Sequence, residues 1–236
     1  MNKIRLIVLL LLTCFILFPV DAAYAKKGTQ VLIPDTVKDT HSKYTAKYES
    51  GIRQHCTAIL ISSNVALTAK HCGGNQRTKY GGTIYPGESG LSTPFGYMNI
   101  SEYIPNPDYD IAILKGTDRD QSRAYQYYIK KFKTPVTGFS DQELQDFVGK
   151  EAYSYGYPYK YSGYKQYRSD GEVEFYEKSV PILRTTLPAF EGQSGSGVFT
   201  KNGEFIGIII TRTANNEANV LPFTEKIAQW INKNEK

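Results

Sequence analysis

The sequence has no internal repeat, no long linker and no dense block of basic side chains. The first two absences argue against a solenoid or an array of small modules. The third gives no support to a nucleic-acid-binding function. Hydrophobic residues make up 41% of the 236 residues and charged residues 22%, which is ordinary for a globular protein. The length fits one large domain or two small ones.

An apolar run long enough to cross a membrane is also absent. The hydrophobic segment near the N-terminus is interrupted by Pro19 and Asp21, short of the roughly 20 residues that a span needs. Lys3 and Arg5 precede this segment, and small residues of the A-x-A type follow it. The pattern predicts a secretory signal peptide over residues 1–25, rather than a membrane anchor, and an extracellular mature chain.

Cysteine is scarce, and Cys14 lies inside the predicted signal peptide. Its place within the apolar run argues against a lipoprotein. Cys56 and Cys72 remain, and an even pair of cysteines in an exported protein predicts a disulfide. Removing residues 1–25 takes away two basic residues and one acidic residue, so the net charge falls from +5 to +4. We therefore expect an ordinarily solvated surface, with neither nucleic acid nor membrane as a partner of the mature chain.

Short apolar or alternating runs, separated by Gly, Pro, Asn and Asp, dominate the mature chain. They predict strands at residues 56–61, 65–69, 110–115, 151–157, 172–180, 196–200, 204–211 and 219–223. Only the tail reads as helical, because Thr224 is a candidate N-cap and Ile227, Trp230 and Ile231 share one face at helical spacing. This pattern indicates an all-β fold, a sandwich or a pair of barrels, closed by one helix.

The chain has only three histidines. We interpret His41 and His55 as structural or surface residues. His71 differs because it stands directly before Cys72 in the pattern T-A-x-H-C, after two short strands joined by a turn. A disulfide to Cys56 would clamp this hairpin and fix the histidine in place.

Two further segments supply what a histidine base needs. Asp110 begins an apolar strand in PDYDIAIL, where a carboxylate can orient an imidazole, although taken alone an aspartate at the start of a strand is more typical of a turn cap. All three histidines precede Ser194 by more than a hundred positions, which excludes the serine–acid–histidine order of the α/β-hydrolases. The order His71, Asp110, Ser194 remains. Ser196 is a rival nucleophile, but only Ser194 has a glycine, Gly192, two residues before it.

The motifs TAKHC, DIAIL, GQSGSGVF and NGEFIGI resemble the bacterial branch of the chymotrypsin-like serine proteases, which includes the glutamyl endopeptidases and the staphylococcal exfoliative toxins. The resemblance runs from about Val31 to the C-terminal helix. It implies two six-stranded β-barrels packed face to face, over residues 31–125 and 126–222, followed by a helix over residues 224–234. The active site would lie in the cleft between the barrels.

The resemblance implies a serine endopeptidase with Ser194 as nucleophile, His71 as general base and Asp110 as the residue that orients the base. The N–H groups of Gly192 and Ser194 would form the oxyanion hole. It implies a monomer that acts on protein or peptide substrates without a cofactor or metal ion.

The resemblance also identifies residues for substrate binding. They are Ala189, Glu191, Ile209, Ile210 and Arg212. The family holds a glutamate side chain with a histidine and a threonine, and Ile209 and Ala189 stand in their places. Arg212 could reach an acidic substrate from the rim. Pro188 occupies the place of the acidic residue in trypsin-type pockets, so we expect an apolar or neutral residue before the cleaved bond.

Gln193 precedes the nucleophile, so the ion pair between a new N-terminal amine and an aspartate, used by animal digestive enzymes, cannot form. The resemblance suggests a zymogen with a short pro-segment at residues 26–30 and a mature chain that begins at Val31.

Tyrosines at 153, 155, 157, 159 and 161 alternate along the chain, which would place them on one face of a strand or extended loop. We interpret them as a docking surface for a peptide or sugar, or as a plain solvent-facing β surface. This cluster and the altered pocket leave a second function open, that of a secreted binding or adhesion protein on a protease scaffold with little or highly restricted proteolysis.

Overall fold

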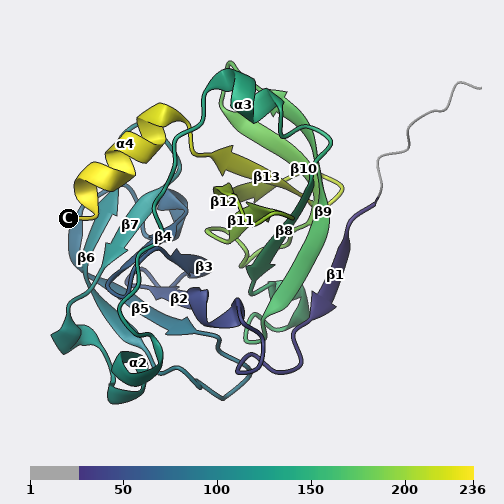
Figure 1. Cartoon of the computed structure of the whole chain (residues 1–236). Helices are drawn as coiled ribbons and strands as arrows, with labels where there is room; N and C mark the ends of the chain where they lie inside the picture. The colour runs from purple at the N-terminus through teal and green to yellow at the C-terminus, as the bar shows by residue number, and fades with distance from the viewer. Residues whose placement is uncertain (1–26) are drawn as a thin grey trace, which may run out of the picture.

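The computed structural model describes residues 27–236, and the predicted signal peptide lies outside these residues. The described chain forms two β-barrels that lie side by side (Figure 1). The first barrel contains six antiparallel strands, β2 (Thr45–Ser50), β3 (His55–Leu60), β4 (Val65–Thr68), β5 (Thr78–Pro86), β6 (Met98–Pro105) and β7 (Ala112–Lys115). They close in the order β2-β3-β4-β7-β6-β5.

The second barrel also contains six strands, β8 (Glu151–Gly156), β9 (Tyr167–Glu177), β10 (Ile182–Pro188), β11 (Gly197–Thr200), β12 (Phe205–Arg212) and β13 (Glu217–Pro222). They run in the order β9-β10-β13-β12-β11-β8, and pairing of β8 with β9 closes the ring. The predicted pair of six-stranded barrels is therefore confirmed. The boundary predicted between residues 125 and 126 falls within a short helix of the connecting segment.

A further strand, β1 (Thr29–Leu32), lies along the outer edge of β9 (Figure 1). It pairs with the first half of β9, where Val31 faces Arg168, whereas β10 pairs with the second half, beginning at Val173. Part of the predicted pro-segment thus forms a strand in the described chain. Its removal stays a prediction.

The expectation that only the tail is helical is wrong. The segment between the barrels contains α2 (Arg123–Tyr128) and α3 (Asp141–Gln145). Both helices are too short to show an apolar period, and their signal is instead a cap, because Ser122 and Ser140 each accept a hydrogen bond from the first turn. Single 3-10 turns occur at η1 (Ser42–Tyr44), η2 (Lys70–Cys72), η3 (Asp118–Asp120) and η4 (Tyr159–Tyr161).

The predicted C-terminal helix is confirmed as α4 (Glu225–Asn234), which begins after Thr224 as N-cap. Its buried face, Ile227, Ala228 and Ile231, packs into an apolar cluster with residues of both barrels. This shared cluster fixes the position of one barrel against the other and so the shape of the cleft between them. Within the described residues, no helix has the length and apolar character needed to cross a membrane.

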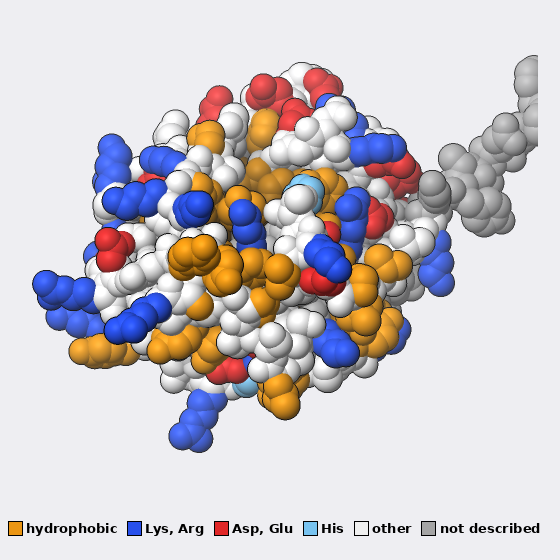
Figure 2. Space-filling model, turned by 60° about the horizontal axis from the view of Figure 1, so that its bottom comes forward, with side chains coloured by type: hydrophobic (Ala, Val, Ile, Leu, Met, Phe, Trp, Pro, Cys, Tyr) orange, Lys and Arg blue, Asp and Glu red, His pale blue; other side chains and the backbone are white. Residues whose placement is uncertain are grey.

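Charge is spread over the surface. On the face drawn in Figure 2, Lys and Arg side chains are interspersed with acidic, apolar and uncharged polar ones. No continuous basic field covers that face, in agreement with the pattern of the sequence.

Candidate active site

His71 lies in η2, directly after β4. Two contacts hold this turn in place. Cys72 forms the predicted disulfide with Cys56 of β3, across a separation of 16 residues, and a loop of that length is worth about 3 kcal/mol of stability. The buried Tyr103 hydroxyl donates to the backbone oxygen of Lys70 at 2.7 Å. The turn that carries His71 is therefore anchored on both sides.

Asp110 stands two residues before β7 begins and faces His71. Its Oδ1 accepts the backbone N–H of His71 at 3.0 Å, and its Oδ2 lies 2.8 Å from Nδ1 of the His71 ring. Burial opposes ionisation of this carboxyl, but hydrogen bonds from His71 and the positive charges of His71 and Lys70 outweigh it, so the pKa of Asp110 lies below its ordinary value. Asp110 is therefore ionised at neutral pH, and its contribution to stability is lost only as the pH falls through the lowered pKa.

Ser194 lies in the loop between β10 and β11 of the second barrel. Its Oγ is 2.9 Å from Nε2 of His71. The structure thus brings Asp110, His71 and Ser194 into one chain of hydrogen bonds across the two barrels. Ser196 is fully buried and takes no part in this chain.

Gly192 has a φ of +93°, which glycine adopts readily and other residues rarely do. A Cβ at this position would lie 2.4 Å from the backbone oxygen of Tyr157. The N–H groups of Gly192 and Ser194 have no acceptor among the described residues. Both groups are therefore available to a ligand beside Ser194, as an oxyanion hole requires.

A pocket of about 420 Å³ opens beside Ser194. It is lined by all five residues predicted for substrate binding, Ala189, Glu191, Ile209, Ile210 and Arg212. Ala189 and Ile209 form a buried apolar wall, 1% and 2% exposed. Arg212 is exposed and bonds to Asn216. The position of Arg212 at the rim agrees with the expectation from the sequence.

The sequence did not single out several residues that the structure places around this site. Phe190 and Thr211 line the pocket. Thr57 of β3 donates its hydroxyl to the backbone oxygen of Gly192 at 2.8 Å. The sequence around Thr57 and Phe190 carries no local signal for such roles, because the roles arise from contacts between distant segments.

The other two histidines are not part of this hydrogen-bonded chain, although His55 lines a pocket that also contains His71 and Ser194. The ring of His41 packs against the rings of Tyr153 and Tyr155. His55 lies 3.9 Å from a Glu49 carboxylate oxygen. His71 is also close to the two cysteine sulfur atoms, but these are bonded to each other, so this group does not form a metal site.

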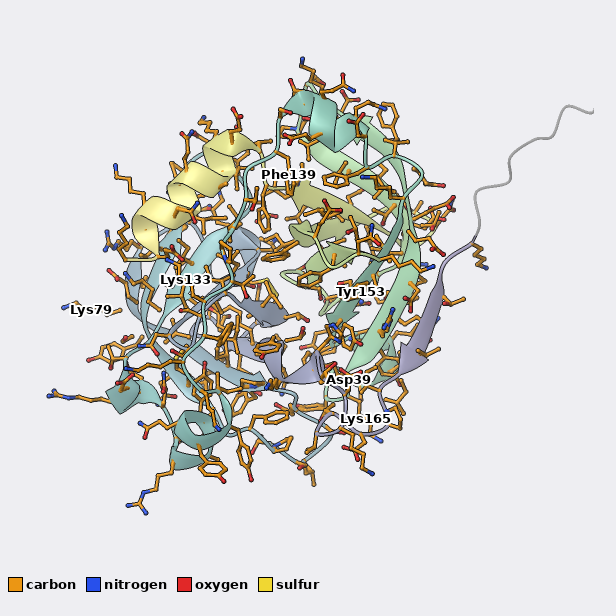
Figure 3. All side chains as sticks on the ribbon, in the orientation of Figure 1. Asp39, Lys79, Lys133, Phe139, Tyr153 and Lys165 are labelled. Carbon is orange, nitrogen blue, oxygen red and sulfur yellow. A yellow bond between two sulfur atoms is a disulfide. The ribbon has the colours of Figure 1, made fainter. Side chains whose placement is uncertain are left out.

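The five alternating tyrosines do not form one exposed face. Tyr153 and Tyr155 are buried on β8 and line an apolar cavity between the barrels, and Figure 3 labels Tyr153 on that side of the second barrel. Tyr157 is 1% exposed. Only Tyr159 and Tyr161 are substantially exposed, because the strand ends at residue 156 and the chain turns into η4. Both interpretations of the five tyrosines, as a docking surface and as a solvent-facing β surface, are therefore wrong.

The N-terminal strand contacts the residue before the nucleophile. Gln30 of β1 donates its amide to Ser169 Oγ at 2.8 Å, to Pro188 O at 3.2 Å and to Gln193 Oε1 at 3.2 Å. The same Gln193 oxygen accepts the backbone N–H of Phe190 at 2.8 Å. Gln30 and Gln193 thus hold β1 against the segment that forms the pocket wall.

In a chain that retains residues 26–30, replacing Gln30 with alanine is expected to lower the free energy of unfolding by about 1 to 3 kcal/mol, because the hydrogen bonds of its amide group are lost. Thermal unfolding of the two proteins measures the effect. Val31→Ala is the matched control on the same strand, since that side chain is half exposed. An equal effect of both substitutions would show that the Gln30 contacts add nothing specific.

Comparisons with known proteins bear on the family and on the fold. The trypsin family model matches residues 35–231. Exfoliative toxin A of Staphylococcus aureus is 26% identical over 161 residues, which is 64% of this chain and 54% of the toxin. The chain therefore spans about half the length of that relative.

Two solved structures share the fold. The structure of a Glu endopeptidase in complex with MPD has a TM-score of 0.69 at 20% identity, covering 86% of this chain and 95% of its own. The protease Anisep from Arthrobacter nicotinovorans has a TM-score of 0.64 at 16% identity, covering 83% and 96%.

Proposed function

The chain belongs to the trypsin family, and from this premise we propose that it is a secreted serine endopeptidase in which Ser194, His71 and Asp110 form the catalytic triad. The observation that carries the proposal is the continuous hydrogen-bonded chain from Asp110 Oδ2 through His71 to Ser194 Oγ. The side chains come from different barrels, so their alignment depends on the whole fold rather than on one local motif.

In the proposed reaction, Ser194 Oγ attacks the carbonyl carbon of the peptide bond as His71 Nε2 takes its proton. His71 then gives this proton to the leaving amine, and an acyl-enzyme on Ser194 remains. Water, deprotonated by His71, hydrolyses the acyl-enzyme. Asp110 holds the proton on Nδ1, so that Nε2 is free to accept one, and stabilises the imidazolium that forms.

The negative charge of the tetrahedral intermediate would be bound by the N–H groups of Gly192 and Ser194. One such donor is worth about 3 to 4 kcal/mol in the transition state. The positive φ of Gly192 supports this role, because a side chain here would collide with the Tyr157 backbone.

We propose a preference for an apolar or neutral residue before the cleaved bond. The buried wall of the pocket carries Ala189 and Ile209, which offer no polar partner to a carboxylate or an ammonium group. Burying an unpaired charge against this wall would cost several kcal/mol, because the charge loses its hydration and gains no partner. Arg212 and Glu191 are exposed and would act from the rim.

A peptide library profiled by mass spectrometry tests the proposal. The purified chain is expected to cleave after apolar or neutral residues, and Ser194→Ala is expected to abolish cleavage. Ser196→Ala is the matched control, since its buried hydroxyl has no hydrogen-bond partner among the described residues and its loss leaves the triad intact. Cleavage mainly after glutamate would contradict the pocket assignment. No cleavage at all would favour the binding or adhesion function.

A further inference from the structure

The peptide groups on either side of Gly192 are held from outside their own loop. The backbone N–H of Tyr159, in η4, donates to the backbone oxygen of Glu191 at 2.7 Å. On the other side, the Thr57 hydroxyl donates to the backbone oxygen of Gly192 at 2.8 Å. Thr57 also donates its backbone N–H to the oxygen of Ser194 at 2.9 Å. Three carbonyl groups around the nucleophile are thus bound by two residues.

The orientation of these carbonyl groups determines that of the N–H groups. In a trans peptide the C=O and N–H bonds point in opposite directions, and the described chain has no cis peptide. With the Glu191 oxygen bound to Tyr159, the N–H of Gly192 must point away from η4. This N–H has no acceptor among the described residues.

We propose that Tyr159, through its backbone N–H, and Thr57, through its hydroxyl, are positioning residues that form the oxyanion hole before substrate binds. This inference rests on the proposed function. It also assigns a role to the tyrosine-rich segment, in place of the docking surface that the structure does not form. The ring of Tyr159 is not the group that acts; its amide is.

Hydrogen bonds restrain the segment that carries the Tyr159 N–H. Within the turn, the N–H groups of Tyr161 and Gly163 both donate to the oxygen of Pro158, at 3.1 Å each. At its start, the fully buried Tyr157 donates its N–H to Thr57 Oγ1 at 3.2 Å. The Tyr157 hydroxyl accepts the amide of Gln166 at 3.1 Å. Thr57 and the turn are therefore parts of one hydrogen-bonded unit.

Without these bonds, the Glu191–Gly192 peptide could rotate, because glycine populates both signs of φ. Rotation would turn a carbonyl oxygen toward the place where the oxyanion forms, and a donor would become a repulsive acceptor. Since one oxyanion donor is worth about 10² to 10³ in kcat, partial loss of its alignment would lower kcat while substrate binding in the pocket continues.

Two substitutions at position 159 separate the effect of the N–H from that of the ring. Tyr159 is the first residue of η4, where proline fits well, and Pro158 before it has a ψ of 129°, as a residue before proline requires. Tyr159→Pro lacks both the ring and the N–H. Tyr159→Ala lacks only the ring and is the matched control.

The experiment measures kcat and KM of both variants on the best peptide from the library. It also measures the inhibition constant of a peptide aldehyde, because the adduct of the aldehyde with Ser194 places an oxyanion in the oxyanion hole. We expect kcat of Tyr159→Pro to be about tenfold to a hundredfold below that of Tyr159→Ala. The aldehyde should inhibit Tyr159→Pro more weakly by a similar factor, and the KM values of the two variants should agree within about threefold. Equal kcat values in the two variants would overturn the role of the amide.

Substitutions of Thr57 test the proposal independently, which matters if Tyr159→Pro does not fold. Thr57→Val removes the hydroxyl at nearly constant shape, and Thr57→Ser keeps it. We expect Thr57→Val to lose at least tenfold in kcat relative to Thr57→Ser, and equal values would contradict the proposal. An unmodified chain that neither hydrolyses peptides nor reacts with a fluorophosphonate would instead refute the proposed function itself.

Discussion

Asp110→Asn is expected to lower kcat by about 10⁴-fold with little change in KM, the size of effect seen when the acid of such a triad becomes an amide. The physical reason lies in the 2.8 Å contact between Asp110 Oδ2 and His71 Nδ1. An amide nitrogen at this place donates to Nδ1, so the ring carries its proton on Nε2. Nε2 then faces Ser194 as a donor and cannot accept the proton of the hydroxyl. Steady-state kinetics on a peptide substrate measures the loss.

Asp108→Asn is the matched control for this substitution. It makes the same chemical change in the same turn, but Asp108 is exposed and pairs with Lys226 rather than with His71. We expect its kcat to stay within about twofold of the unmodified chain, because exposed ion pairs contribute little. A loss of less than tenfold in Asp110→Asn would mean that Asp110 does not set the tautomer of His71.

The second large effect is expected for Gly192→Ala, which should lower kcat by about 10² to 10³. The new Cβ would lie 2.4 Å from the Tyr157 backbone oxygen and would also require φ near +93°. The Cβ is fixed to the backbone of residue 192, and the oxygen that it meets belongs to the backbone of Tyr157. Neither atom can rotate away as a flexible side chain could, so the loop must move, and the N–H of residue 192 moves with it. The measurement is kcat together with inhibition by a peptide aldehyde.

Gly203→Ala separates the effect on the site from the general cost of an alanine at positive φ. Gly203 has a φ of +88°, but a Cβ there meets no atom within 4 Å. We expect it to lose about 1 to 2 kcal/mol of stability and to keep its kcat. If both variants lost the same small factor in kcat, the oxyanion hole would not depend on Gly192.

Much of the fold was predictable because its signals are local. Apolar runs such as residues 204–211 predicted central strands, and the cap at Thr224 predicted the C-terminal helix. Five strands, β1, β2, β5, β6 and β10, were missed. A register shift between Lys79 and Gly82 breaks the alternation of β5. The strand β1 has only four residues, too few to show a period, and it is a strand only through its pairing with β9. The helices α2 and α3 were missed for the same reason of length, although Ser140 and Glu143 form a capping box.

The candidate triad was predictable because chain order and the number of histidines limit the alternatives, and the structure places His71, Asp110 and Ser194 in contact as expected. The family was identified correctly from the motifs around these residues. The supports of the site were not predictable. Thr57 and Tyr159 act through contacts between segments that lie more than 30 residues from Ser194 in the chain. Their residue types carry no sign of such contacts.

The tyrosine-rich segment shows where a periodic pattern misleads. The alternating tyrosines over residues 153–161 would share one face only if the whole segment were extended, but β8 ends at Gly156. Gly156 lies against Ser196 and Thr57, where a Cβ would be only 2.3 Å from Ser196 Oγ. Gly156 and Tyr157 are thus held by Ser196 of the second barrel and Thr57 of the first. These contacts join distant segments, and the alternating pattern of the tyrosines carries no sign of them.

The most direct test of Ser194 as the nucleophile is the reaction of the purified chain with a fluorophosphonate, followed by mass spectrometry of its peptides. We expect one adduct, on Ser194, which persists in Ser196→Ala, forms slowly in Asp110→Asn and is absent from Ser194→Ala. A folded chain that forms no adduct, or one that is labelled equally in Ser194→Ala, would contradict the assignment of Ser194 as the nucleophile of a serine endopeptidase.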